Sequence, residues 1–182
     1  CILLHPDNAD MPFPLVFTGP ASAAAYFEQV DQFIRLVLGD ATAERYQIII
    51  DDPEAVALAM LQGLEEVRDY RSDHKDAWYY NWRLQIDLPF QKPFEPTHEL
   101  MAGLDISREL PVHELAANLR RVFSGIVAGN VKPRTIKAIR EHGKFEISGD
   151  REFMASLDRL LQSFIEQHRM KLPGTKYEPC YR

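Results

Sequence analysis

Residues 115–130 constrain the fold of this chain more than any other stretch. They read LAANLRRVFSGIVAGN, and their apolar members recur at the three- and four-residue spacing that lines one side of an α-helix. The second half also carries Ser124, Gly125, Ala128 and Gly129, although a glycine inside a helix costs about 1 kcal/mol relative to alanine. We therefore expect an apolar face buried in a core and a small face under a close contact with another helix, a partner subunit or a ligand.

Composition limits what the chain does. Its 182 residues suffice for one large domain or two small ones, and their scattered basic residues and net charge of -6 argue against nucleic-acid or membrane partners. No apolar run reaches the roughly 18 residues of a membrane span. Two cysteines at opposite ends form no metal-ligand cluster, which predicts a reducing, cytoplasmic setting. Because the sequence starts with Cys1 in an apolar run, we expect the C-terminal part of a longer protein.

The first third of the sequence predicts a βαβ unit. An apolar strand over residues 13–18 ends at Gly19-Pro20, a helix ends at Gly39, and a β-branched strand over residues 46–50 is expected to be buried on both faces. Asp52 and Pro53 then cap a further helix. The residues that this helix is expected to bury are Val56, Met60, Leu64 and Val67. The fold class is therefore α/β with parallel strands.

The remainder is expected to be mainly helical. Aromatic residues crowd residues 78–82, and alternating Leu84, Ile86 and Leu88 predict a strand. Helices are predicted over residues 98–103, 112–129, 133–142 and 150–169, with a short strand over 144–147 and an irregular surface tail from residue 172. We place a domain boundary between residues 69 and 70, so that residues 1–69 form the α/β part and residues 70–182 form the helical domain.

The best candidate for ligand contact follows the first strand. In parallel sheets ligands collect beyond the carboxyl ends of strands, where a glycine lets backbone N–H groups approach a phosphate at the next helix N-terminus. This pattern nominates Thr18, Gly19, Ser22 and Tyr26 as substrate-binding residues. The alternative is a plain strand-to-helix turn without a ligand.

The other motifs give weaker evidence for a functional site. His98-Glu99 and His113-Glu114 begin like the HExxH zinc signature, but Ala102 and Ala117 stand where the second histidine belongs, so no metal site is expected. No Walker A, GxSxG, GxGxxG or PGG motif is present. The aromatic residues 78–82 suit interdomain packing better than base stacking. Two basic helix ends, residues 130–132 and 168–171, are explained by capping and by the helix dipole, with anion contact as the alternative.

Five runs of sequence resemble one enzyme family along essentially the whole chain. They are FTGP after the first strand, YNWRLQID, PFEPTHELMA, LRRVFSGIVAGNVK and QHRMKLPGTKYEPCY. These runs are similar to the C-terminal part of the bacterial pyrimidine/purine nucleotide 5'-monophosphate nucleosidases, multidomain members of the Lonely Guy, or lysine-decarboxylase-like, family. The resemblance implies that residues 1–69 end a Rossmann-like nucleosidase domain and that residues 70–182 are a family-specific C-terminal domain.

The family also implies an activity and its regulation. Water cleaves the N-glycosidic bond of nucleoside monophosphates, giving free base and ribose 5-phosphate without a cofactor, in a cytoplasmic homotetramer controlled by guanosine tetra- and pentaphosphate. The family's catalytic PGGxGTxxE loop would lie upstream, so no catalytic residue is assigned in this chain. The alternative is a non-catalytic regulatory or oligomerisation module. An amino-acid decarboxylase is a weaker alternative, since nothing marks Lys75, Lys92 or Lys132 as a Schiff-base lysine.

Overall fold

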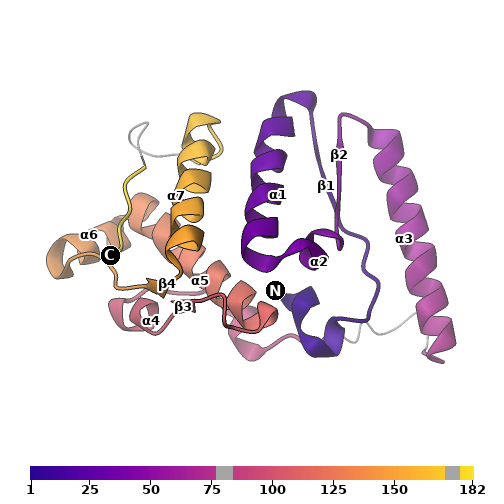
Figure 1. Cartoon of the computed structure of the whole chain (residues 1–182), viewed down its shortest axis with the longest axis horizontal. Helices are drawn as coiled ribbons and strands as arrows, with labels where there is room; N and C mark the ends of the chain where they lie inside the picture. The colour runs from indigo at the N-terminus through magenta and orange to yellow at the C-terminus, as the bar shows by residue number, and fades with distance from the viewer. Residues whose placement is uncertain (77–83, 171–176) are drawn as a thin grey trace. The chain divides into compact units, whose positions relative to one another are not determined.

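The computed structural model describes residues 1–76, 84–170 and 177–182, and it is mainly helical with short parallel strands (Figure 1). The chain forms two compact units, one of residues 2–86 and one of residues 87–182 together with Cys1. This content agrees with the expected α/β class, whereas the Rossmann-like sheet and the boundary between residues 69 and 70 stay predictions. The aromatic residues 78–82 lie outside the described residues. No helix in the described ranges is both long and apolar enough to cross a membrane.

The first unit is built around the predicted βαβ arrangement. Strands β1 (Val16–Gly19) and β2 (Gln47–Ile50) are parallel, with Val16 opposite Gln47 and Gly19 opposite Ile50. Figure 1 shows them between α1 (Ala24–Leu38) and α3 (Pro53–Asp73). The short elements of this unit are η1 (Ile2–Leu4), η2 (Pro6–Asn8), η3 (Ala21–Ala23) and α2 (Asp40–Ala43). The expectation that β2 is buried on both faces is wrong, since Gln47 is exposed and the three isoleucines are half-buried beside one described partner strand.

Helix α3 begins as predicted but buries a different face. Asp52 caps it by accepting a hydrogen bond from the Ala55 N–H at 2.9 Å. Its buried residues are Ala59, Gly63, Val67 and Arg71. Of the four predicted residues only Val67 is buried, and Leu64 is 44% exposed. The reason is close packing, because a Cβ at Gly63 would lie 2.4 Å from Pro14 Cβ and only a small face fits there.

The strand predicted at Leu84, Ile86 and Leu88 is not formed. Residues 84–87 are irregular, and Leu88–Gln91 is the 3₁₀ helix η4. The fully buried side chain of Asn8 takes the place of a partner strand. Its amide donates to the carbonyl oxygens of Ile2 and Gln85, and its oxygen accepts from the Gln85 N–H at 2.8 Å. Both backbone groups of Gln85 are thus paired by one side chain, which removes the need for a ladder.

The predicted helices of the second unit are confirmed. They are α4 (His98–Ala102), α5 (Val112–Val131), α6 (Pro133–His142) and α7 (Arg151–Glu166). Two short strands, β3 (Asp105–Ile106) and β4 (Ser148–Gly149), pair in parallel. The side chains with 0% exposure that make the centre of this unit are Met101, Ile106, Val122, Ile126, Phe145, Leu157 and Leu161.

The chain's last residues belong to the core of this unit rather than to a surface tail as predicted. Tyr177 and Cys180 are buried. The strand predicted over residues 144–147 is reduced to a single parallel bridge, between Phe145 and Tyr181. The Phe145 N–H donates to the Cys180 carbonyl at 3.0 Å, and the Arg182 N–H donates to the Phe145 carbonyl at 2.9 Å.

The small face of α5 is covered from within the same unit. A Cβ at Gly125 would lie 2.4 Å from Met101 Sδ of α4. A Cβ at Gly129 would lie 2.5 Å from Cys180 Sγ and 2.8 Å from Ile139 Cδ1 of α6. The Cys180 thiol donates in turn to the Ile126 carbonyl at 3.6 Å. The close contact expected from the sequence is therefore made by α4, α6 and the C-terminal segment.

Replacing Gly125 by leucine should destabilise the second unit by about 2 kcal/mol or more, because a packed core resists added volume. Its neighbour Ile126 is also fully buried, but leucine and isoleucine have the same volume. Ile126→Leu should therefore cost less than about 1.5 kcal/mol. Urea unfolding of both variants measures the two losses. Equal losses would show that the small face has no packing role.

Two tyrosines hold the C-terminal segment on α7. The hydroxyls of Tyr177 and Tyr181 donate to the two carboxylate oxygens of Asp158, each at 2.8 Å. Burial, with the nearby Asp158 carboxylate, raises the pKa of both phenols above the ordinary value of 10.0. The folded protein therefore holds these protons more tightly than the unfolded chain does.

This linkage predicts a loss of stability in alkali. Because the folded pKa values are raised, the stabilisation is complete below pH 10 and declines as the pH rises beyond it. The double variant Tyr177→Phe/Tyr181→Phe is less stable at neutral pH but should lose less of its remaining free energy of unfolding between about pH 9 and pH 11. Denaturant titrations at each pH give the two slopes. Parallel slopes in parent and variant would contradict the assignment.

Candidate functional site

The predicted ligand residues lie at the carboxyl end of β1, where parallel sheets bind ligands. Thr18 is exposed and opposite Ile49, and Gly19 is opposite Ile50. Pro20 then caps η3, which places the exposed Ser22 in the turn that leads into α1. The structure thus brings Thr18, Gly19 and Ser22 into one strand-to-helix turn, as the sequence indicated.

Gly19 has a packing reason that the sequence did not reveal. A Cβ at this position would lie 3.1 Å from Phe27 Cε2 and 3.2 Å from the Ala23 Cβ. The Phe27 ring also stacks on Phe17 of β1, with centroids 6.2 Å apart. Tyr26 directs its half-buried ring edge-on to Phe27 at 5.0 Å, so this residue takes part in the same aromatic packing. The glycine lets α1 lie close to the end of β1 whether or not a ligand binds.

Asp51 is the residue that sequence reasoning missed at this edge. Its N–H donates to the Gly19 carbonyl at 2.9 Å, which places it directly beside the end of β1. Its φ of 57° is left-handed, a conformation that aspartate tolerates better than most residues, and its side chain is exposed. The signal was available, because an acid that follows the second strand of a βαβ unit suits a ribose hydroxyl. The sequence pattern at Asp52 and Pro53 indicates only a helix cap.

The carboxyl edge therefore presents two hydroxyls and a carboxylate. Thr18 and Ser22 offer donors to an anion, and Asp51 offers an acceptor to a sugar hydroxyl. Asp52, next to it, already accepts the Ala55 N–H as the α3 cap. This set contains no nucleophile activated by a base.

A cavity of about 350 Å³ lies at the opposite end of the same two strands. It is lined by the residues before β1, by residues 44–47 before β2, and by Gln62, Gly63 and Glu66 of α3. Its arginine, Arg45, is held by the carbonyl oxygens of Leu3 and Ala9. None of the predicted ligand residues lines it. We therefore place the candidate site at the carboxyl edge.

The histidines of the HExxH-like segments have structural contacts. His98 Nε2 lies 2.8 Å from the Gly143 carbonyl oxygen, and its ring packs on Phe145 with centroids 4.9 Å apart. His113 Nε2 lies 3.9 Å from the Glu114 carboxylate. Within the described residues, no three or more His, Cys, Asp or Glu side chains gather as metal ligands.

Asn130, for which the sequence predicts a helix cap with anion contact as the alternative, makes contacts within the second unit. Its amide donates to the Ile126 carbonyl at 2.9 Å and lies 3.8 Å from Cys180 Sγ. It is the last but one residue of α5 rather than its cap, since Lys132 ends that helix. Burial raises the pKa of the Cys180 thiol beside it to about 11, which makes this cysteine a poor nucleophile at neutral pH.

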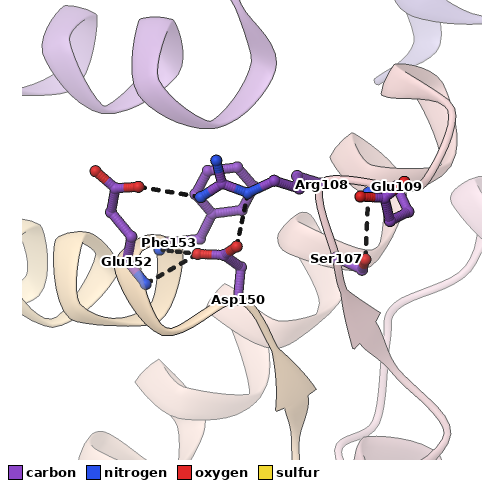
Figure 2. A network of polar contacts seen from close by, with 6 residues as sticks. All are labelled: Ser107, Arg108, Glu109, Asp150, Glu152 and Phe153. Carbon is purple, nitrogen blue, oxygen red and sulfur yellow. Dashed lines mark hydrogen bonds and ion pairs between the residues drawn. The ribbon is translucent and has the colours of Figure 1, made fainter.

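A polar network joins β3 to the start of α7 (Figure 2). Arg108 donates through Nε to Asp150 at 2.7 Å and through a terminal nitrogen to Glu152 at 3.0 Å, and its guanidinium lies 4.9 Å from the centroid of Phe153. Asp150 also caps α7 by accepting the N–H groups of Glu152 and Phe153. The Arg108 hydrogen bond holds the pKa of Asp150 below its usual range. Arg108, Asp150 and Glu152 are paired with one another, so we assign this network to structure.

Comparison with known proteins decides the family. The model described as "Pyrimidine/purine nucleotide monophosphate nucleosidase, C-terminal" matches residues 64–182. The chain belongs to this family. The match starts within α3 and covers residues 87–182 of the second unit, so the resemblance to the C-terminal part of these nucleosidases is confirmed.

Individual relatives agree with the family match. The chain is similar to proteins named pyrimidine/purine nucleotide 5'-monophosphate nucleosidase from Escherichia coli strain K12, from E. coli O6:H1 and from E. coli O157:H7. Each is 49% identical over 180 residues, which are 99% of this chain and 40% of the relative. The chain therefore spans about two fifths of the length of these relatives.

Proposed function

We propose that this chain is the C-terminal part of an enzyme that hydrolyses the N-glycosidic bond of nucleoside 5'-monophosphates to free base and ribose 5-phosphate. The observation that carries the proposal is the 49% identity along 99% of the chain to proteins named for that activity. The parallel strands of the first unit support it, because their carboxyl edge offers the groups that a ribose phosphate needs. No cofactor is required for such a hydrolysis.

In this proposal the first unit completes a Rossmann-like catalytic sheet of the Lonely Guy type. Thr18 and Ser22 donate to the 5'-phosphate, and Asp51 accepts a ribose hydroxyl. Gly19 and Tyr26 shape the turn that presents these groups. The bond-breaking groups come from a PGGxGTxxE loop elsewhere in the full-length protein. Residues 1–69 then belong to the nucleosidase domain and residues 70–182 to the family's helical domain.

The proposal also includes regulation and assembly of the full-length protein. The full-length protein acts in the cytoplasm as a homotetramer, and guanosine tetra- or pentaphosphate controls it. One observation favours a regulatory or oligomerisation role for this part of the chain. Leu58, Leu61 and Leu64 of α3 are 61%, 58% and 44% exposed, and at this spacing they form one apolar stripe on the helix.

The activity is tested by incubating the full-length protein with purine and pyrimidine nucleoside monophosphates and following base release by chromatography. We expect release from at least one of them and none from the isolated 182-residue chain. No release from any nucleotide by a folded full-length protein would refute the proposal. If only the assembly role is correct, the isolated chain will self-associate in light scattering while the full-length protein releases no base.

The binding role of the carboxyl edge is tested by single substitutions in the full-length protein. A hydrogen bond to a charged group contributes about 1.5–3 kcal/mol, so Thr18→Ala and Ser22→Ala should each raise KM for the nucleotide by roughly tenfold or more. Ser72→Ala, a change of an exposed serine near the far end of α3, is the matched control and should leave KM unchanged. Unchanged KM values in all three variants would remove Thr18 and Ser22 from the site.

A further inference from the structure

Helix α3 carries its large apolar side chains on the face that points away from its own unit. It packs on that unit through the small residues Ala59 and Gly63, and Figure 1 shows β1 and β2 on one side of the helix. The leucines Leu58, Leu61 and Leu64 are exposed. An apolar stripe of this kind on the solvent side of a helix indicates a surface that further protein covers.

This face of α3 is symmetric about Leu61. Leu58 lies three residues before it, and Leu64 lies three residues after it. The exposed Glu54 lies seven residues before it, and the exposed Arg68 lies seven residues after it. Seven residues make about two helical turns, so both charged side chains emerge on the same side of the helix as Leu61. From one end to the other, the face therefore presents an acid, three leucines and a base.

The two charges at the ends of this face have no partner in the part of the chain that the structure describes. Neither Glu54 nor Arg68 makes a hydrogen bond or an ion pair there. In the same unit, by contrast, the guanidinium nitrogens of Arg35 lie 2.8 and 3.0 Å from two carboxylates. Fourteen residues of helix hold Glu54 and Arg68 about 21 Å apart, so they can meet only across two helices.

We propose that α3 packs antiparallel on α3 of a second copy of this chain, across a two-fold axis at Leu61. Each residue then meets the residue equally far beyond Leu61 on the other helix. Leu58 packs on Leu64 of the second copy, and Glu54 pairs with Arg68 of the second copy. The axis repeats both contacts, so the interface has two leucine contacts and two ion pairs around a central leucine pair. The inference deepens the assembly role in the proposed function and rests on that role.

Charge decides the direction of packing. A parallel arrangement in the same register would set Glu54 beside Glu54 and Arg68 beside Arg68, and like charges repel. The antiparallel register also avoids a second clash of acids. Glu65 lies four residues after Leu61, and the residue four before it is the small, exposed Ala57. The Glu65 carboxylate therefore comes opposite a methyl group, which also lets the two helices lie close together.

Cysteine crosslinking of the full-length protein tests the contact. Leu61→Cys places a thiol on the proposed two-fold axis, where it meets its own copy, so mild oxidation should give a dimer that dithiothreitol reverses. Gln62→Cys, an exposed position about 100° further round α3, is the matched control. It should crosslink at least about fivefold more slowly, because the two thiols point apart. The parent, oxidised in the same way, gives the background from its own cysteines.

Charge reversal in the Leu61→Cys protein tests the register. Glu54→Arg or Arg68→Glu alone sets like charges against each other in both ion pairs and should slow crosslinking by about threefold to tenfold. Glu54→Arg/Arg68→Glu restores opposite charges across the axis and should recover the Leu61→Cys rate. Because the two positions are too far apart to pair within one helix, recovery reports a contact between copies.

Each outcome bears on the proposal once circular dichroism has shown that the variant is folded. No dimer from Leu61→Cys overturns it and leaves the stripe to another part of the full-length protein or to a different partner. Equal crosslinking at positions 61 and 62 also overturns it, since random collision gives that result. A charge-reversed double variant that stays slow overturns the antiparallel register. None of these measurements uses a substrate, so they are distinct from failure of the proposed activity, which shows as no base release by the parent.

Discussion

Close packing at glycine positions determines how this chain is built. In the second unit, Gly125 and Gly129 let Met101 and Cys180 approach the α5 backbone more closely than any side chain would allow. In the first unit, Gly63 does the same for Pro14, and Gly19 for Phe27. At such positions the helix gives up roughly 1 kcal/mol of intrinsic propensity, and dense packing with buried apolar surface offsets the loss. Both units therefore use glycine to let neighbouring residues pack closely, although the units are built from different elements.

This packing also explains what is left exposed. Since α3 meets its unit through Ala59 and Gly63, the larger leucines of the same helix face outward. The described sheet of the first unit has two strands, and its isoleucines are only half-buried. Apolar surface of this extent is common where a chain contacts further protein. It is consistent with a chain that spans 40% of the length of its relatives.

Sequence periodicity predicted the helices and strands better than the contacts between residues far apart in the sequence. The helices of the second unit, the parallel βαβ arrangement and the Asp52 cap follow from local patterns of apolar, small and capping residues, and all were confirmed. The failures arose where a distant residue decides the outcome. Asn8 pairs the backbone of Gln85, so residues 84–87 form no strand, and the strand predicted over residues 144–147 is limited to one bridge with Tyr181.

The candidate site shows the same division. The turn with Thr18, Gly19 and Ser22 could be placed from the sequence because a strand that ends in glycine and proline has few other meanings. The position of Asp51 beside that turn depends on the register of β1 against β2, which no local pattern contains.

The attachment of residues 177–182 has a consequence for how the second unit opens. This short segment contacts α5 through Cys180 and α7 through Asp158, and it pairs with Phe145 between α6 and β4. Detaching it would expose the seam between three helices at once. We therefore expect this segment to open only when its contacts with α5 and α7 and its pairing with Phe145 break together. The amide protons of Phe145 and Arg182, both in backbone hydrogen bonds, would exchange with solvent only on the timescale of that larger event.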